Sequence, residues 1–197
     1  PQIIADVLPT LRGLVGKDTI VLSIAAGATL KALRKGIGSA AIVRSIPNTP
    51  AQVGRGVTVA IGNTKVNGDA RKLVDTLLAA VGDVIWVKKE DLIDSATAVS
   101  GSGPAYVFHM VEALAAAARH VGFDADAAER LARATVTGAG ELLYRSDLSA
   151  ETLRQNVTSP KGTTAAALKV LMGKGGLTPI MKKSVAAARR RSRQLAG

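Results

Sequence analysis

The sequence predicts an α/β domain with a mostly parallel sheet, followed by an all-helical domain. Three observations predict this fold class: apolar runs of strand length alternate with helical patterns up to residue 87, no convincing strand follows, and the later helices are unusually rich in alanine. Strands that alternate with helices form a parallel sheet that those helices cover. We expect the two domains to span residues 1–95 and 96–197.

The first half begins with a helix and two strands joined by a second helix. Apolar residues recur at helical spacing over 3–11, and the continuous apolar run at 19–24 is typical of a strand buried on both faces. A short helix around 29–35 and a second strand at 41–46 follow. The two prolines of segment 47–50 end that strand, because proline can continue neither a central strand nor a helix.

A third strand at 56–61, a helix over 69–81 and a short strand at 83–87 complete this half. The apolar face of the helix is predicted to consist of Leu73, Leu77, Leu78 and Val81. The motif Gly-x-Gly-x-x-Ala at 36–41 has the form of a dinucleotide-binding turn. It follows a helix and opens a strand, the reverse of the required order, so we expect it to bind no nucleotide.

The second half shows helical periodicity in four segments, at 104–118, 126–143, 163–172 and 179–195. Helices that are apolar around much of their circumference must pack against neighbouring elements on more than one side. The helical half supplies only part of that packing surface itself. We therefore predict a homodimer formed through the helical half.

The composition excludes several classes of site and partner. With no cysteine and two histidines, the chain has no disulfide or thiolate site, and we expect no metal site. No apolar stretch is long enough for a membrane span and the start does not resemble a signal peptide, so we expect a cytoplasmic protein with no membrane partner. The net charge is +11, but no aromatic residues interleave with the cations of the C-terminal helix to stack on bases. We interpret these cations as a solvated face, and expect no nucleic-acid partner.

Two segments predict a ligand-binding shelf at one edge of the sheet. They follow the strands at 19–24 and 41–46, and parallel α/β sheets bind ligands at the carboxyl ends of their strands. Small side chains in the first segment let a flat ring reach the backbone. The two segments consist of Ala25, Ala26 and Gly27 and of Pro47, Asn48, Thr49 and Pro50.

Two further segments precede helices of the second half. In 100–106, Ser-Gly-Ser-Gly-Pro-Ala-Tyr, Pro104 suits the first turn of a helix and leaves amides free, with a capped flexible hinge as the alternative. Segment 159–164, Ser-Pro-Lys-Gly-Thr-Thr, combines hydroxyls and free amides with the positive end of a helix dipole. That combination suits a small carboxylate, with an ordinary capped helix as the alternative.

Six motifs together carry a resemblance to a known family: Pro-Gln at the start and segments 25–27, 47–50, 91–94, 100–106 and 157–164. They resemble pyrroline-5-carboxylate reductase, in that family's order and over essentially the whole chain. The resemblance implies a partial Rossmann-type parallel sheet, the C-terminal part of a dinucleotide-binding domain, followed by a helical domain for dimerisation and substrate binding. It also implies reduction of 1-pyrroline-5-carboxylate to L-proline with NADPH or NADH, the last step of proline biosynthesis, in a homodimer or a ring of dimers.

The resemblance assigns roles to the candidate residues. The cofactor is expected beside Pro1, segment 25–27 and segment 47–50. The substrate carboxylate and ring nitrogen are expected at Ser159, Gly162, Thr163 and Thr164. Of these, Ser159 and Thr164 are the candidate catalytic groups, and Thr164 is the best candidate to hydrogen-bond the nitrogen. Imines are readily protonated, so a strong protein acid is unnecessary.

Two features depart from the family pattern. The family's glycine-rich phosphate loop and the elements around it are absent, so we expect an N-terminally truncated reductase that binds its cofactor weakly or not at all on its own. Lys161 stands where the family usually has glycine, and its side chain either crowds the substrate loop or attracts the carboxylate. A non-catalytic oligomerisation module and, less favoured, a basic nucleic-acid-binding protein are the alternative functions.

Overall fold

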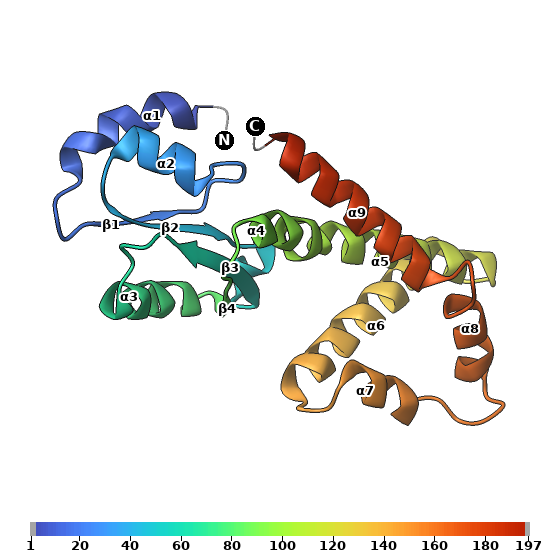
Figure 1. Ribbon diagram of the computed structural model, residues 1–197. Coiled ribbons are helices and arrows are strands. Elements are labelled where there is room, and N and C mark those ends of the chain that lie inside the picture. The colour runs from blue at the N-terminus through green and yellow to red at the C-terminus, as the bar shows by residue number, and fades with distance from the viewer. Residues whose placement is uncertain (1–2, 196–197) are drawn as a thin grey trace. The chain divides into compact units, whose positions relative to one another are not determined.

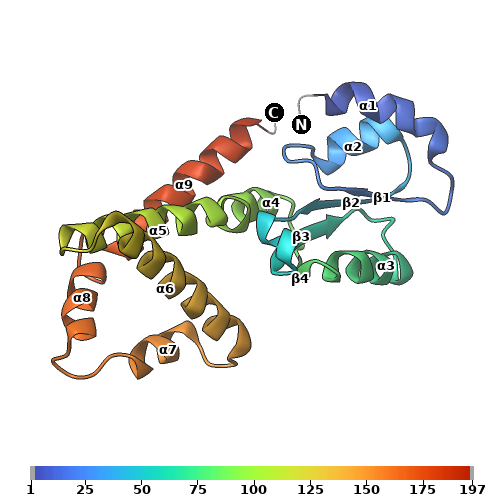
Figure 2. The ribbon, with the colours of Figure 1, turned by 180° about the vertical axis from the view of Figure 1, so that it is seen from behind.

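The computed structural model describes residues 3–195 (Figures 1 and 2). Its internal contacts divide the chain into two compact units, one formed by the residues up to Pro104 together with those from Val185 onward, the other by residues 105–184. The first unit thus includes residues 96–104, which were expected to belong to the helical domain. Among the described residues, no helix has the length and apolar character needed to cross a membrane.

A four-stranded sheet forms the centre of the first unit. Its strands are β1 (Ile20–Ser23), β2 (Ala41–Ile46), β3 (Gly56–Gly62) and β4 (Gly82–Trp86), in the order β1-β2-β3-β4. The pairs β1–β2 and β3–β4 are parallel, which confirms the mostly parallel sheet, whereas β2 and β3 are antiparallel. The connection between β2 and β3 is a single short 3₁₀ turn, η2 (Thr49–Val53), and a parallel crossover needs a longer connection.

Helices cover both faces of this sheet, as Figure 1 shows. Helices α1 (Ile4–Leu11) and α2 (Leu30–Ile37) lie on one face, where Leu8 and Leu33 pack with Ile42 of β2. Helix α3 (Gly68–Ala79) lies on the other face, against Val43 of β2. Because successive side chains of a strand point to opposite faces, Ile42 and Val43 of β2 fill the two layers of the core.

Two sequence expectations about burial are wrong. The first strand is not buried on both faces: three of the four residues of β1 are half-buried, because β1 ends the strand order and, within residues 3–195, pairs with β2 alone. The predicted apolar face of α3 is wrong in part: Leu78 is buried as predicted, but Leu73 and Leu77 are 52% and 57% exposed. The side chains of α3 that pack on the sheet are Ala70, Val74 and Leu78. Alanine and valine are smaller than leucine, so this row lets the helix approach the sheet more closely.

A nearly continuous helical segment follows the sheet. Helix α4 (Asp91–Ala96) runs into a π-helical turn, η3 (Thr97–Gly101), and then into α5 (Gly103–His120). Ile93 of α4 is buried with Ile46, Val59 and Ile61 of the sheet. The segment therefore begins as part of the core of the first unit.

The helices of the second unit bury little apolar surface. They are the rest of α5, α6 (Ala125–Arg145), α7 (Ala150–Asn156), α8 (Thr163–Leu171) and the first part of α9 (Leu177–Leu195). Within residues 105–184 the buried side chains are those of three alanines, Ala115, Ala128 and Ala132. Large apolar side chains such as Phe108 and Val170 are 64% and 74% exposed. In both ribbon views α6, α7 and α8 do not close into a bundle (Figures 1 and 2).

Candidate functional site

The segment after β1 forms a tight turn that leads into α2. The Ala28 amide donates to the Ala25 carbonyl at 3.4 Å, and the Ser23 hydroxyl accepts from the Ala25 amide at 3.3 Å. Gly27, at the third position of this turn, has φ 81°, in the left-handed region that glycine adopts without steric cost. Ala26 is exposed and its neighbours are half-buried, so the turn presents backbone and methyl groups rather than long side chains.

The segment after β2 is held by the side chain of Asn48. Its Oδ1 accepts from the Val57 amide at 2.9 Å, and its Nδ2 donates to the Ser100 carbonyl at 3.2 Å. Thr49 is exposed, while Pro47 and Pro50 are half-buried. Since β1 and β2 are parallel neighbours, segments 25–27 and 47–50 follow the carboxyl ends of the two strands at the same end of the sheet.

The segment at 100–106 fits its prediction only in part: α5 begins at Gly103 with Pro104 in its first turn, as predicted, but the preceding Ser102 amide is not free. The Ser102 amide donates to the Thr97 carbonyl at 2.8 Å, which closes the π-helical turn. The hydroxyls of Ser100 and Ser102 bond back to the carbonyls of Ala96 and Thr97. The glycine- and serine-rich stretch is thus an ordered helical junction, and π-helical turns of this kind often occur at functional sites.

A buried arginine that none of the sequence motifs includes joins the sheet to α4. Arg44 of β2 is 3% exposed, and its Nη1 lies 2.8 Å from Glu90 Oε1. Its Nη2 lies 3.9 Å from Asp94 Oδ1, which also accepts from the Ser192 hydroxyl at 2.9 Å. A lone arginine inside an apolar strand is the signal that points to such a network, because a buried cation requires a partner.

The segment predicted to bind a carboxylate precedes α8 in the second unit. Gly162 is the N-cap of α8 and provides no side-chain cap, so the first three amides of the helix, from Thr163 to Ala165, have no intrahelical acceptor. Within residues 3–195, the hydroxyls of Ser159, Thr163 and Thr164 have no protein partner. The turn thus offers amide and hydroxyl donors at the positive end of a helix.

Lys161 and Gly162 shape this turn. Lys161 has φ 62°, and among the described residues it is the one non-glycine in the left-handed region. The position therefore has the backbone geometry for which glycine is suited. A Cβ on Gly162 would overlap the hydroxyl oxygen of Ser159. Gly162 thus leaves room for the Ser159 hydroxyl beside the start of α8.

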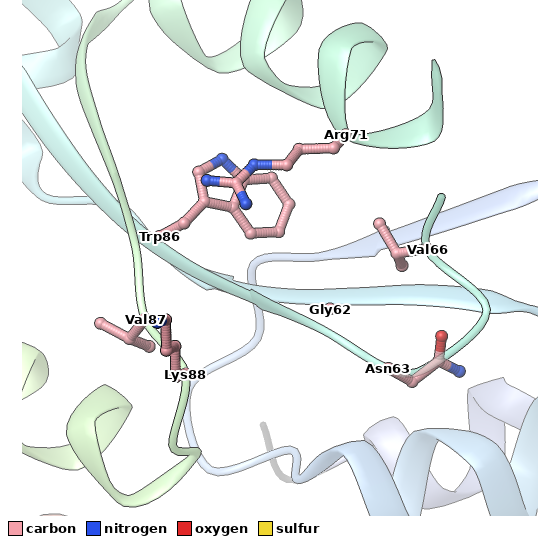
Figure 3. A pocket seen from close by; sticks show the side chains of 7 residues that line it. All are labelled: Gly62, Asn63, Val66, Arg71, Trp86, Val87 and Lys88. Carbon is pink, nitrogen blue, oxygen red and sulfur yellow. The ribbon is translucent and has the colours of Figure 1, made fainter. Parts of the chain in front are cut away.

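A small pocket of about 240 Å³ lies elsewhere in the first unit (Figure 3). The Arg71 guanidinium stacks over the Trp86 ring, 4.7 Å from its centroid, and the Trp86 indole donates to Asp75 Oδ1 at 2.5 Å. The pocket is at the carboxyl end of β3, which runs antiparallel to β2, so it faces the edge opposite to segments 25–27 and 47–50. Two of the side chains that line it, Arg71 and Trp86, are thus already in contact with each other.

The remaining predicted residues are placed as follows. Segments 25–27 and 47–50 belong to the first unit and segment 159–164 to the second, while Pro1 lies outside the described residues. The motif at 36–41 ends α2 and begins β2, as predicted, and so cannot form a dinucleotide-binding turn. No group of three or more histidine, aspartate and glutamate side chains within 3–195 is placed to hold a metal ion.

Residues 90–195 match the family model described as pyrroline-5-carboxylate reductase dimerisation. The chain is 41% identical to pyrroline-5-carboxylate reductase of Synechocystis over 99% of its own length and 72% of the relative's, and 39% identical to that of Pisum sativum over 99% and 71%. Among solved structures, a pyrroline-5-carboxylate reductase from Coxiella burnetii superimposes with a TM-score of 0.93 at 40% identity, covering 100% of this chain and 73% of the other. The Plasmodium falciparum pyrroline carboxylate reductase with NADP bound gives a TM-score of 0.84 at 31% identity, covering 100% and 74%.

Proposed function

The chain belongs to the pyrroline-5-carboxylate reductase family, and we propose that segments 25–27 and 47–50 hold its nicotinamide cofactor and segment 159–164 its substrate. The activity is that of the family, an oxidoreductase that reduces 1-pyrroline-5-carboxylate to proline with NAD(P)H. When bound, the cofactor supplies the hydride that reduces the C=N bond. The protein's task is to hold the reacting carbon against the nicotinamide and to neutralise the charge of the substrate.

The cofactor assignment is supported by the geometry of the strand ends. Segments 25–27 and 47–50 leave two parallel strands at one edge, where open α/β sheets bind ligands. The side chains of Ala25 and Ala26 end at Cβ and Gly27 has none, so a flat ring can lie against the backbone. Asn48 is held by two hydrogen bonds, so the second segment is fixed before any ligand binds.

The uncapped N-terminus of α8 is the observation that carries the substrate assignment. Its first-turn amides have no intrahelical acceptor, and the helix dipole favours an anion there. The substrate carboxylate satisfies both conditions. The hydroxyls of Ser159 and Thr163 add donors, and Thr164 is the second residue of the helix, from which its hydroxyl is available to the ring nitrogen. A hydrogen bond from that hydroxyl orients the imine and stabilises the developing amine.

The second unit supports self-association as part of the same function. Residues 105–184 bury three alanines and leave large apolar side chains exposed, which in a soluble monomer is an unusual amount of apolar surface. The matching family model is one for dimerisation, and it covers these helices. A second copy of the chain is therefore the partner that we assign to this unit, in a homodimer or a ring of dimers.

The proposed substrate site is tested by kinetics of the complete gene product. We expect oxidation of NADPH or NADH that depends on pyrroline-5-carboxylate. Loss of one hydrogen bond to the reacting group in Thr164→Ala should lower kcat/KM about tenfold or more. The control is Thr76→Ala on α3, whose hydroxyl bonds to its own helix, and it should keep wild-type kinetics. Wild-type kcat/KM in Thr164→Ala contradicts the site, and absence of turnover in the wild type favours a non-catalytic oligomerisation module.

A further inference from the structure

One carboxylate oxygen of Glu90 joins two parts of the first unit that lie far apart in sequence. Glu90 Oε1 accepts from the Leu30 amide at 2.7 Å and from Arg44 Nη1 at 2.8 Å. Leu30 is the first residue of α2, and the turn at residues 25–28 directly precedes that helix. Glu90 is also the N-cap of α4, but its side chain makes no cap there. The Glu90 carboxylate instead accepts from the first amide of α2.

The contact adds to the capping of α2. The Thr29 hydroxyl accepts from the Ala32 amide at 3.1 Å, and Glu90 takes the Leu30 amide, which Thr29 does not reach. A carboxylate at this end of a helix is also favoured by the helix dipole. The start of α2, and with it the end of the preceding turn, is therefore fixed by a residue 60 positions away.

Arg44 fixes the position of Glu90 in turn. The Glu90 side chain is 32% exposed and would sample several rotamers by itself, whereas Arg44 is 3% exposed and extends from the middle of β2. The ion pair thus fixes the position of the Glu90 carboxylate relative to the sheet. Segment 47–50 follows the same strand, so both segments of the shelf are positioned relative to Arg44.

We infer that Glu90 is a positioning residue for cofactor binding, which holds the turn at residues 25–28 in place through the Leu30 amide and Arg44. The inference rests on the proposed function of this turn as the nicotinamide side of the site. It gives Glu90, the residue that directly precedes segment 91–94, a task in the site that it performs without touching either reactant.

Three variants of the complete gene product test the inference. Glu90→Ala removes both contacts, and Glu90→Gln keeps an oxygen that can accept from the Leu30 amide. Asp69→Ala is the matched control, because it also removes a carboxylate from the first turn of a helix, α3, but away from the shelf. For each variant, NADPH affinity is measured by calorimetry, the KM for pyrroline-5-carboxylate by steady-state kinetics, and amide protection at residues 26–30 by hydrogen exchange.

We expect Glu90→Ala to weaken NADPH binding about tenfold and Glu90→Gln about threefold, since a hydrogen bond to a charged group is stronger than one to a neutral group. Both should raise exchange at residues 26–30 and leave the KM for pyrroline-5-carboxylate within about twofold of wild type, because the change is confined to the cofactor side. Asp69→Ala should bind NADPH like the wild type.

Unchanged NADPH affinity, or unchanged exchange at residues 26–30, in the Glu90 variants overturns the inference. If Glu90→Ala does not fold, the same comparison applies to Glu90→Gln. A wild-type protein that binds no nicotinamide nucleotide overturns the proposed function instead. The exchange measurement then still reports whether Glu90 holds the turn, so the two failures are distinguishable.

Discussion

The side-chain amide of Asn48 donates a hydrogen bond to the backbone carbonyl of Ser100 across 3.2 Å. The contact joins two motifs that the sequence shows as separate, the Pro-Asn-Thr-Pro segment after β2 and the Ser-Gly-Ser-Gly segment at the π-helical turn. Together with the contact from Glu90 to Leu30, it fastens both loops at the shelf edge to the segment between residues 90 and 100. The geometry of the shelf thus depends on that segment.

Asn48→Ala is expected to weaken both stability and cofactor binding. The variant leaves the Val57 amide and the Ser100 carbonyl without their partner, which costs about 1–3 kcal/mol of unfolding free energy. The KM for NADPH should rise severalfold because the segment after β2 is no longer held. Asn67→Ala is the control, since Asn67 caps α3 through the Ala70 amide and its loss costs about 1 kcal/mol. Equal cofactor KM values for the two variants contradict this role of Asn48.

Lys161→Gly and Lys161→Met separate the backbone effect of Lys161 from its charge. Glycine removes the left-handed strain at φ 62° and should stabilise the protein by about 1 kcal/mol in denaturant unfolding, whereas methionine should not. Lys161 is exposed, so its ammonium is free to attract the substrate carboxylate. We expect both variants to raise the KM for pyrroline-5-carboxylate about two- to threefold. A lower KM in Lys161→Gly means instead that the side chain crowds the loop.

Gly162→Ala tests the room beside Ser159. The added methyl group displaces the Ser159 hydroxyl, so the KM for pyrroline-5-carboxylate should rise about five- to tenfold while the KM for NADPH stays unchanged. Gly68→Ala, at the start of α3, meets nothing within 4 Å and serves as the matched control with wild-type kinetics. A Gly162→Ala enzyme with wild-type substrate KM shows that the Ser159 hydroxyl is not a substrate contact.

Arg44→Met is expected to destabilise the first unit strongly. It leaves the carboxylates of Glu90 and Asp94 without their shared cation, and breaking one side of a buried ion pair costs about 3–5 kcal/mol. Glu90 is one-third exposed, so water offsets part of that cost, and we expect about 2–3 kcal/mol in denaturant unfolding. The double variant with Glu90→Gln should recover part of the loss. If the two substitutions are simply additive, the residues are not coupled.

Local patterns predicted most of the regular elements because those elements have strong local signals. The strand at 41–46 has the predicted bounds, since a glycine-containing turn precedes it and Pro47 follows it. The helices α5, α6, α8 and α9 were found within a few residues of their ends. Helices α4 and α7 were missed because they have only 6 and 7 residues, too few to show a helical period.

The network around Arg44 was beyond the reach of local patterns. Arg44 and its partner Glu90 are 46 residues apart in sequence, and Glu90 and Leu30 are 60 residues apart. Nothing in the spacing of these residues shows that they meet. The π-helical turn was missed for another reason: glycine and serine at 100–103 favour a loop by propensity, and the packing of Ala98 in the core overrides that preference.

A crystal structure of the complete gene product with NADP and proline is the decisive measurement for the proposed site. We expect the proline carboxylate within about 3 Å of the first amides of α8 and of the Ser159 hydroxyl, with its ring nitrogen at the Thr164 hydroxyl. We also expect the nicotinamide against residues 25–27 and 47–50. Proline bound away from the start of α8, with Ser159 and Thr164 facing solvent, would show that the substrate site lies elsewhere.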